Sequence, residues 1–367
     1  MFETDPKGAG GGPHRIVEAA LDYHHRGWPV VRLNGKAPTR KDWQVIKYDE
    51  AELVSIFAGG NSNIGVVLGE VSSLVDVDLD CYEARAMAAE FLPKTPARFG
   101  RKSSRQSHCL YTVVGAVKTQ RLADPEEQGG AAGDHKGAII ELRGDGAQTM
   151  MPPSTHPTGE PVEWETELAV PATVNLEELR DSVLRLAAAS VIVRRWHKLS
   201  RHDAALALTG ALLQGGLSVE VTTHFLLTVV GAAGDDEPDD RARAIEDTIK
   251  RSSAGEPIAG AAKCREIFGD KTWSKISEWL GLRNAGEWET LDASIVNGCR
   301  HAAPELPLDG LGDRWASWVA EQAALKSAPA DYVVASLMAA AAGLIGNARA
   351  VLLGRVGKSH RFCGARA

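Results

Sequence analysis

Hydrophobic and polar residues follow regular patterns through the first 165 residues of the chain. From His14, apolar residues recur at helical spacing until Gly27, and residues 49–57 repeat this pattern behind Asp49, a residue type that caps helix starts. Short apolar runs predict strands at residues 28–33, 63–69, 74–79, 109–114 and 138–142, with a further helix over 82–91. The alternation predicts a mixed α/β (α+β) domain with a mixed sheet over residues 14–165, behind a flexible leader at 1–13.

The pattern becomes helical throughout after Pro171. We expect an all-α region over residues 177–282 that includes a helix–turn–helix at 266–280, with Gly269 and Asp270 at its turn. The acidic run 235–240 is expected to be a solvated loop. The core candidates of this region are apolar residues at helical spacing, namely Leu184, Leu186, Leu206, Leu208, Leu212, Leu213, Phe225, Leu226 and Val229.

A third region, residues 287–367, begins with a linker and continues as helices from Trp315. Its longest apolar stretch, residues 332–345, is shorter than the ~20 residues that span a bilayer, so it predicts a buried helix. The N-terminal residues lack an apolar signal core. We therefore expect a soluble, cytoplasmic protein with no membrane partner.

Composition and charge narrow this picture only slightly. Hydrophobic residues make up 44% and charged residues 24%, as in ordinary globular proteins, and 367 residues suit two or three domains. The net charge of −7 does not favour a nucleic-acid binder, so any such binding requires local basic patches. The five cysteines contain no C-x-x-C pair, which argues against a disulfide framework and a sequence-local zinc site.

Acidic residues recur at every second position of the run LVDVDLD, residues 74–80. On a strand, Asp76, Asp78 and Asp80 share one face, where like charges repel one another. A divalent cation removes this conflict, and Mg²⁺ takes one or two carboxylates together with substrate phosphates. The alternative is an exposed strand with a solvated acidic face.

Two later segments add candidate chemistry. Glu141 is the single acid of the strand at 138–142 and could close a metal site, or it could pair with Arg143 at a sheet edge. A basic, serine-rich loop at 98–106 runs into Ser107 and His108, which begin the next predicted strand. Such groups suit a triphosphate, although a histidine at this place is also an ordinary polar strand end.

Taken in order, these segments resemble the bifunctional DNA primase/polymerase N-terminal family of the archaeo-eukaryotic primase superfamily. The family pattern of a D-x-D strand, a Ser-His pair and a later acidic strand is matched by Asp78 and Asp80, Ser107 and His108, and Glu141. Flanking matches run in the same order, namely Arg26-Gly-Trp-Pro-Val30, Lys36-Ala-Pro38, Trp43, Asn63-Ile-Gly-Val66, Gly69, Ser72, Arg143-Gly144, Met151-Pro-Pro-Ser-Thr-His-Pro157, Gly159 and Trp164.

The resemblance implies a DNA primase/polymerase that transfers nucleotides from nucleoside triphosphates onto a strand directed by a single-stranded DNA template. It implies Mg²⁺ or Mn²⁺ held by Asp78, Asp80 and Glu141, with His108 on the triphosphate. Asp76, one step before the family pair, is expected to be a substitute ligand or a supporting group. Arg101 and Arg143 are further candidates for phosphate contacts.

The later regions resemble segments that follow such domains. Residues 177–282 look like a primase-associated helical domain, in which Arg194, Arg195, Lys198 and Arg201 could meet template phosphates or form a solvated helix face. Residues 287–367 look like the start of a phage-type helicase region, which suggests phage, prophage or plasmid replication and a helicase partner. The string at 354–359 resembles a phosphate loop, but Leu352 stands where that motif needs glycine.

Two other classes of function compete with this interpretation. The first is a non-catalytic replication module that binds DNA or a partner helicase. Such a module would not need all three acids and the histidine of the family pattern, and all four are present here. A phosphotransferase of another fold would require a glycine-rich phosphate loop, and the sequence offers no convincing one.

Overall fold

The computed structural model describes residues 13–60, 62–127, 137–166, 169–196, 200–283 and 306–345. Nearly all of the expected leader and the string at 354–359 lie outside these residues. The chain divides into two compact units, residues 1–287 and residues 288–367.

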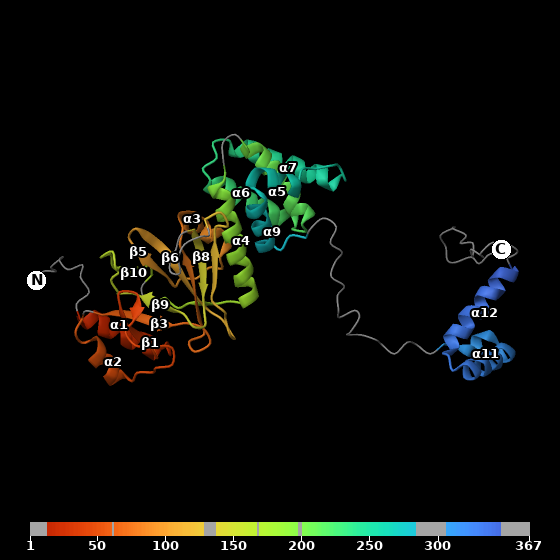
Figure 1. Ribbon diagram of the computed structural model, residues 1–367, viewed down its shortest axis with the longest axis horizontal. Coiled ribbons are helices and arrows are strands. Elements are labelled where there is room, and N and C mark those ends of the chain that lie inside the picture. The colour runs from red at the N-terminus through yellow and green to blue at the C-terminus, as the bar shows by residue number, and fades with distance from the viewer. Residues whose placement is uncertain are drawn as a thin grey trace, which may run out of the picture. The chain divides into compact units, whose positions relative to one another are not determined.

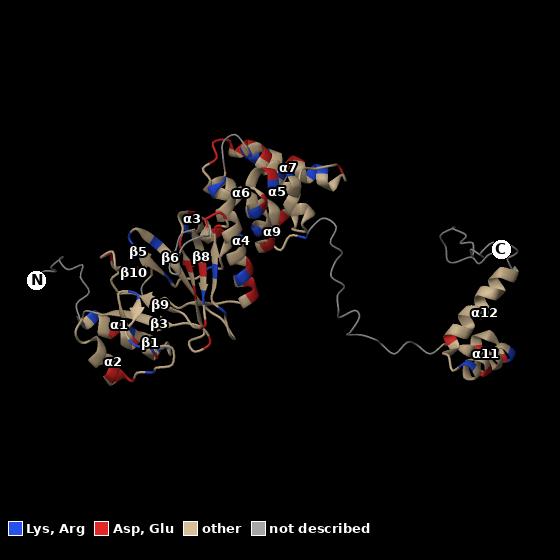
Figure 2. Cartoon of the chain, viewed as in Figure 1, with Lys and Arg blue, Asp and Glu red and all other residues tan. Residues whose placement is uncertain are grey.

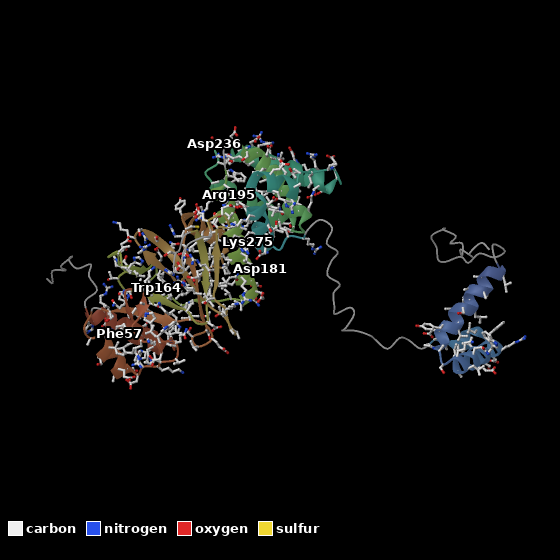
Figure 3. The ribbon with its side chains drawn as sticks, in the orientation of Figure 1. Phe57, Trp164, Asp181, Arg195, Asp236 and Lys275 are labelled. Carbon is white, nitrogen blue, oxygen red and sulfur yellow. The ribbon has the colours of Figure 1, made fainter. Side chains whose placement is uncertain are left out.

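A small antiparallel sheet carries the first two helices of the N-terminal unit. Its strand order is β2 (Ala37–Pro38), β1 (Val30–Asn34), β3 (Asn63–Val67) and β9 (Gln148–Met151). Helices α1 (Pro13–His25) and α2 (Glu50–Phe57) pack on it, and Phe57 is fully buried there (Figures 1 and 3). Asp49 caps α2 as expected, in a reciprocal capping box with Glu52.

A larger sheet follows in the chain and neighbours the first one. Its order is β10 (Val162–Trp164), β5 (Arg98–Arg101), β6 (Ser104–Thr112), β4 (Leu74–Leu79), β8 (Ala138–Arg143) and β7 (Gln120–Ala123). These pairs are antiparallel, while β11 (Ala172–Thr173) joins β6 in parallel, so the expected mixed sheet is confirmed. The chain returns to the small sheet with β9, and this links the two sheets.

The strand β4 separates apolar from acidic side chains, as its period of two predicts. Val75, Val77 and Leu79 are buried in the core that the sheet forms with α3 (Tyr82–Phe91) and α4 (Leu176–Arg194). Burial of each such side chain contributes about 1.5–3 kcal/mol. Asp76 and Asp78 therefore project from the opposite face, away from these helices.

The helical region continues the same unit. It contains α5 (Arg201–Gln214), α6 (Val219–Ala232), α7 (Pro238–Ser253), α8 (Ala261–Phe268) and α9 (Asp270–Trp279). One core cluster extends from Val75 on the sheet to Trp279 on α9. The predicted helix–turn–helix is confirmed, because Gly269 ends α8 and precedes α9 with a φ of 82°. Of the core candidates, Leu184 and Leu206 are partly buried and pack against this cluster.

Two charged segments of the helical region differ from expectation. Asp235 is not solvated: its side chain is fully buried and accepts hydrogen bonds from Trp196 Nε1 (2.7 Å) and Arg241 Nε (3.3 Å). The basic cluster is not a free surface, since Arg194 and Arg195 pair with Asp124, as Arg201 does with Asp236. Buried charges require such partners, and the fold supplies them from segments that are distant in sequence. Lys198 lies outside the described residues.

The C-terminal unit contains a short 3-10 helix (Leu308–Leu311), α11 (Asp313–Lys326) and α12 (Ala330–Ile345). The expectation of a buried helix at 332–345 is wrong for the described residues. Tyr332 is 70% and Met338 52% exposed, because within residues 306–345 α12 packs mainly against α11. Figure 2 shows that α12 is almost free of charged residues. No described helix is both long and apolar enough to cross a membrane.

Candidate active site

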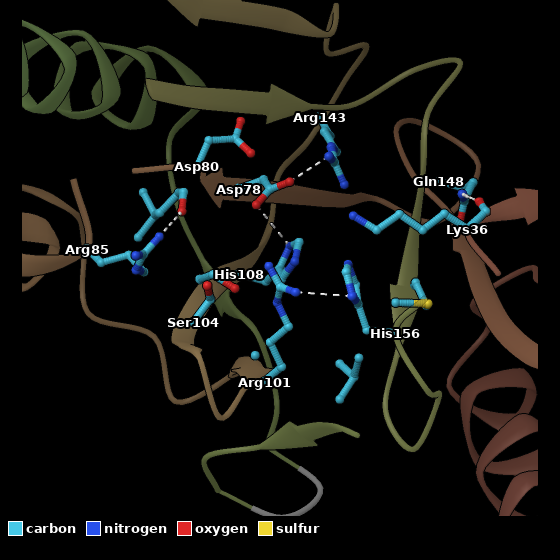
Figure 4. Close-up of a pocket in the computed structure, with 15 residues that line it drawn as sticks. Lys36, Asp78, Asp80, Arg85, Arg101, Ser104, His108, Arg143, Gln148 and His156 are labelled. Atoms are coloured by element: carbon cyan, nitrogen blue, oxygen red, sulfur yellow. Dashed lines mark hydrogen bonds and ion pairs between the residues drawn. The ribbon is translucent and has the colours of Figure 1, made fainter. Parts of the chain in front are cut away.

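A cleft lies where the acidic face of β4 meets the small sheet. The large sheet contributes Asp78, Ser107, His108 and Arg143, and the segments linked to the small sheet contribute Lys36, Gln148 and Met150. Asp80 follows directly after β4 and lines the same cleft. Figure 4 shows Asp78 between His108 and Arg143, with Lys36 and His156 across from it. The two sheets thus bring acids and cations from distant segments into one space.

The imidazole of His108 is held from several sides. In the β4–β6 register His108 lies opposite Asp78, and its Nδ1 is 2.9 Å from Asp76 Oδ2 and 3.7 Å from Asp78 Oδ1. Its ring stacks on Phe99 with 4.6 Å between centroids and 8° between planes. Burial lowers the pKa of His108, but the carboxylates of Asp78 and Asp76 outweigh it and raise that pKa overall.

Arg143 lies within ion-pair distance of three carboxylates. Its Nη2 lies 2.5 Å from Asp78 Oδ2, its Nε donates to Glu141 Oε2 at 2.7 Å, and its Nη1 is 3.9 Å from Asp76. Burial lowers the pKa of the guanidinium, but the three acids outweigh this effect and raise that pKa overall. Burial also opposes the charge of Asp76, but His108 and Arg143 lower the pKa of this carboxyl. The carboxyl of Asp76 therefore lies between two basic partners, and Arg143 also contacts Asp78 and Glu141.

The carboxylates suit a hard divalent cation in the type of their donor atoms. Among the described residues no group of three or more acids, histidines or cysteines is arranged to hold a metal. Asp78 and Asp80, however, both line the cleft. One or two protein carboxylates are the usual share of Mg²⁺, and substrate phosphates supply the remaining ligands. The donor set thus fits a metal that binds together with a phosphorylated substrate.

Cationic groups surround these acids. Lys36 reaches in from the turn between β1 and β2, where Gln148 donates to its carbonyl oxygen. Arg101 lies 3.1 Å from His156 Nδ1 and 3.5 Å from Glu160. Lys36, Arg101 and His156 line the same cleft, and burial and then the charges of Lys36 and Arg101 lower the pKa of His156. A group of basic side chains at one cleft suits the phosphates of a nucleotide.

The structure gathers most of the residues that the sequence singled out. Asp78, Asp80, Ser107, His108, Arg101 and Arg143 line the cleft. Asp76 lies behind it with no exposed side-chain surface, and Glu141 faces Asp78 across the β4–β8 register with its carboxylate on Arg143. Glu141 is not on an edge strand, because β8 lies between β4 and β7.

The segment before His108 differs from the predicted loop. Residues 98–106 form most of a hairpin of β5 and β6, so His108 lies within its strand rather than at the start. The hairpin turns other basic side chains away from the cleft: Arg98 bonds to Gln106, and Arg105 pairs with Glu165. Strand alternation, once the hairpin is recognised, explains why only part of this basic segment reaches the site.

Sequence reasoning missed several cleft residues. Lys36, Arg85, Ser104, Gln148, Met150, His156 and Val162 all line the cleft. Lys36 and His156 stand in segments that matched the family pattern, so their place in that pattern was the available signal. No sequence feature indicated that the β1–β2 turn approaches the acidic strand, because this approach depends on how the sheets pack.

The comparison with known families agrees with this geometry. The model of the family described as bifunctional DNA primase/polymerase, N-terminal, matches residues 20–179, which include both sheets and the start of α4. No curated protein matches the chain. Residues 20–179 therefore belong to the bifunctional DNA primase/polymerase N-terminal family, and the chain carries a primase/polymerase-type domain of DNA replication.

Proposed function

We propose that this domain is an active nucleotidyltransferase that extends a nucleic-acid strand along a single-stranded DNA template from nucleoside triphosphates. The observation that carries the proposal is the common cleft of Asp78, Asp80 and His108, ringed by Lys36 and Arg101, inside the segment that matches the family. A binding module without catalysis has no need for acids and cations that converge in this way.

The reaction joins the 3′-hydroxyl oxygen of the strand to the α-phosphorus of the incoming triphosphate. The bond from that phosphorus to the bridging oxygen breaks, pyrophosphate leaves with the electron pair, and the hydroxyl proton passes to solvent. Lys36, Arg101 and His108 bind and orient the phosphates, because each carries or can carry positive charge at the cleft wall. Arg143 is a further phosphate contact when it leaves the carboxylates.

Asp78 and Asp80 would hold Mg²⁺ or Mn²⁺, with Glu141 as a third candidate once Arg143 has moved. When bound, the metal supplies activation of the attacking hydroxyl and charge neutralisation on the triphosphate. The type of the oxygen donors supports this assignment.

We further propose that the chain acts in phage, prophage or plasmid replication together with a replicative helicase. The support is the family match and the resemblance of the later helical regions to segments that accompany such domains. The helical region would meet the template through surfaces other than Arg194, Arg195 and Arg201, which are already paired with acids.

Primer extension on a single-stranded template with Mn²⁺ tests the proposal. Asp78→Ala/Asp80→Ala should lower the rate by about 10³-fold, because several kcal/mol of transition-state stabilisation are lost. Asp181→Ala/Asp247→Ala removes two exposed helical acids and is the matched control. Equal extension by wild type and the active-site variant would indicate a contaminating polymerase. A wild type that binds DNA but never extends it would favour the non-catalytic module.

A further inference from the structure

The acidic strand carries one aspartate more than a two-acid metal site uses. Asp78 and Asp80 line the cleft, whereas Asp76 does not. The side chain of Asp76 has no exposed surface, and its Oδ1 is buried without a hydrogen-bond partner among the described residues. A ligand in the cleft therefore cannot reach Asp76 unless the surrounding side chains move.

The contacts of Asp76 point instead to His108. Asp76 Oδ2 lies 2.9 Å from His108 Nδ1, closer than Asp78 Oδ1 at 3.7 Å. The parallel stacking on Phe99 fixes the plane of the ring. With its plane and Nδ1 both fixed, the ring can present only its other edge, which carries Nε2, and His108 lines the cleft.

We propose that Asp76 is a positioning residue. It accepts the Nδ1 proton of His108 in a hydrogen bond and so directs Nε2 toward the phosphates of the nucleotide. That the ligand is a nucleotide rests on the proposed function, whereas the orientation of the His108 ring by Asp76 is independent of it. It assigns the third aspartate a role distinct from metal binding.

The first test is a comparison of Asp76→Val with Asp76→Asn in primer extension. Valine suits a strand but offers no acceptor, so KM for the nucleoside triphosphate should rise about tenfold with a smaller change in kcat, as expected for the loss of one charge-assisted hydrogen bond. Asparagine keeps an acceptor oxygen and should restore KM to within about threefold, since a neutral hydrogen bond is the weaker kind.

The second test asks whether Asp76 acts through His108. If it does, Asp76→Val should add almost nothing to His108→Ala, because the single changes remove the same interaction. Additive effects of the two changes on KM would overturn the proposal. Mn²⁺ titration by electron paramagnetic resonance supplies a readout apart from activity: Asp76→Asn should bind as wild type does, whereas Asp78→Asn should bind far less. Equal losses in the two variants would make Asp76 a metal ligand and also overturn the proposal.

The third test reads the ring directly, without substrate. Nitrogen-15 NMR of labelled histidine should show His108 protonated at Nδ1 in wild type and Asp76→Asn, and a changed signal in Asp76→Val. An unchanged signal in Asp76→Val overturns the orientation by Asp76 whatever the activity. If wild type never extends primers but its NMR spectrum shows His108 protonated at Nδ1, the proposed function is refuted and the positioning of His108 by Asp76 is retained.

Discussion

Arg143 acts as the counter-ion of the acidic face, and its removal should destabilise the domain. Its guanidinium lies 2.5 Å from Asp78 and 2.7 Å from Glu141, and all three side chains are at most 22% exposed. Breaking a buried pair on one side leaves charges uncompensated at about 3–5 kcal/mol, and the partial exposure here favours the lower end, about 3 kcal/mol. Arg143→Gln should thus lower the melting temperature by about 6–12 °C, at roughly 2–4 °C per kcal/mol for a unit of this size.

Differential scanning calorimetry with and without Mg²⁺ measures this effect. Because a divalent cation can take over the neutralisation, Mg²⁺ should raise the melting temperature of Arg143→Gln more than that of wild type. Arg85→Gln is the matched control: Arg85 lines the same cleft but bonds to the carbonyl oxygen of Leu79. An unchanged melting temperature in Arg143→Gln, or an equal fall in Arg85→Gln, would refute the counter-ion role.

Three further predictions concern the cleft and its supports. Lys36→Ala should raise KM for the nucleoside triphosphate about tenfold, through one lost charged contact, with kcat nearly unchanged in steady-state extension, whereas the exposed Lys47→Ala should change neither. Burial raises the pKa of Asp124, but hydrogen bonds from two arginines and a backbone amide outweigh it and lower that pKa overall. The stabilisation that this carboxylate gives the fold is therefore present above the unfolded pKa of about 3.9 and is lost as pH falls through the lower folded pKa. Urea titrations should therefore show Asp124→Asn less stable than wild type by about 3 kcal/mol at neutral pH, with the gap closing below about pH 4; a constant gap would contradict this. Gly69→Ala should destabilise by more than about 2 kcal/mol in the same assay, because φ is +91° and a Cβ would meet the side chain and backbone of Asp145; a loss under about 0.5 kcal/mol would show that this turn yields.

The local pattern of the chain determined much of the fold. The cap of α2 by Asp49, the period of two on β4 and the turn at Gly269 were all predicted from neighbouring residues. Each depends on interactions a few residues apart, which the sequence displays directly. The family order likewise marked Asp78 and His108, and the structure places them opposite each other on adjacent strands.

The tertiary structure decided which charges are used together. Sequence could not show that Asp76 is buried against His108 while Asp78 faces the cleft, although both share a strand face. Nor could it show that Lys36, beside the small sheet, lines the same cleft as the acids, or that Arg194 forms an ion pair with Asp124. The fate of a charged side chain depends on partners brought in from distant segments, because burial is tolerated only where the packed fold supplies an opposite charge or a hydrogen bond.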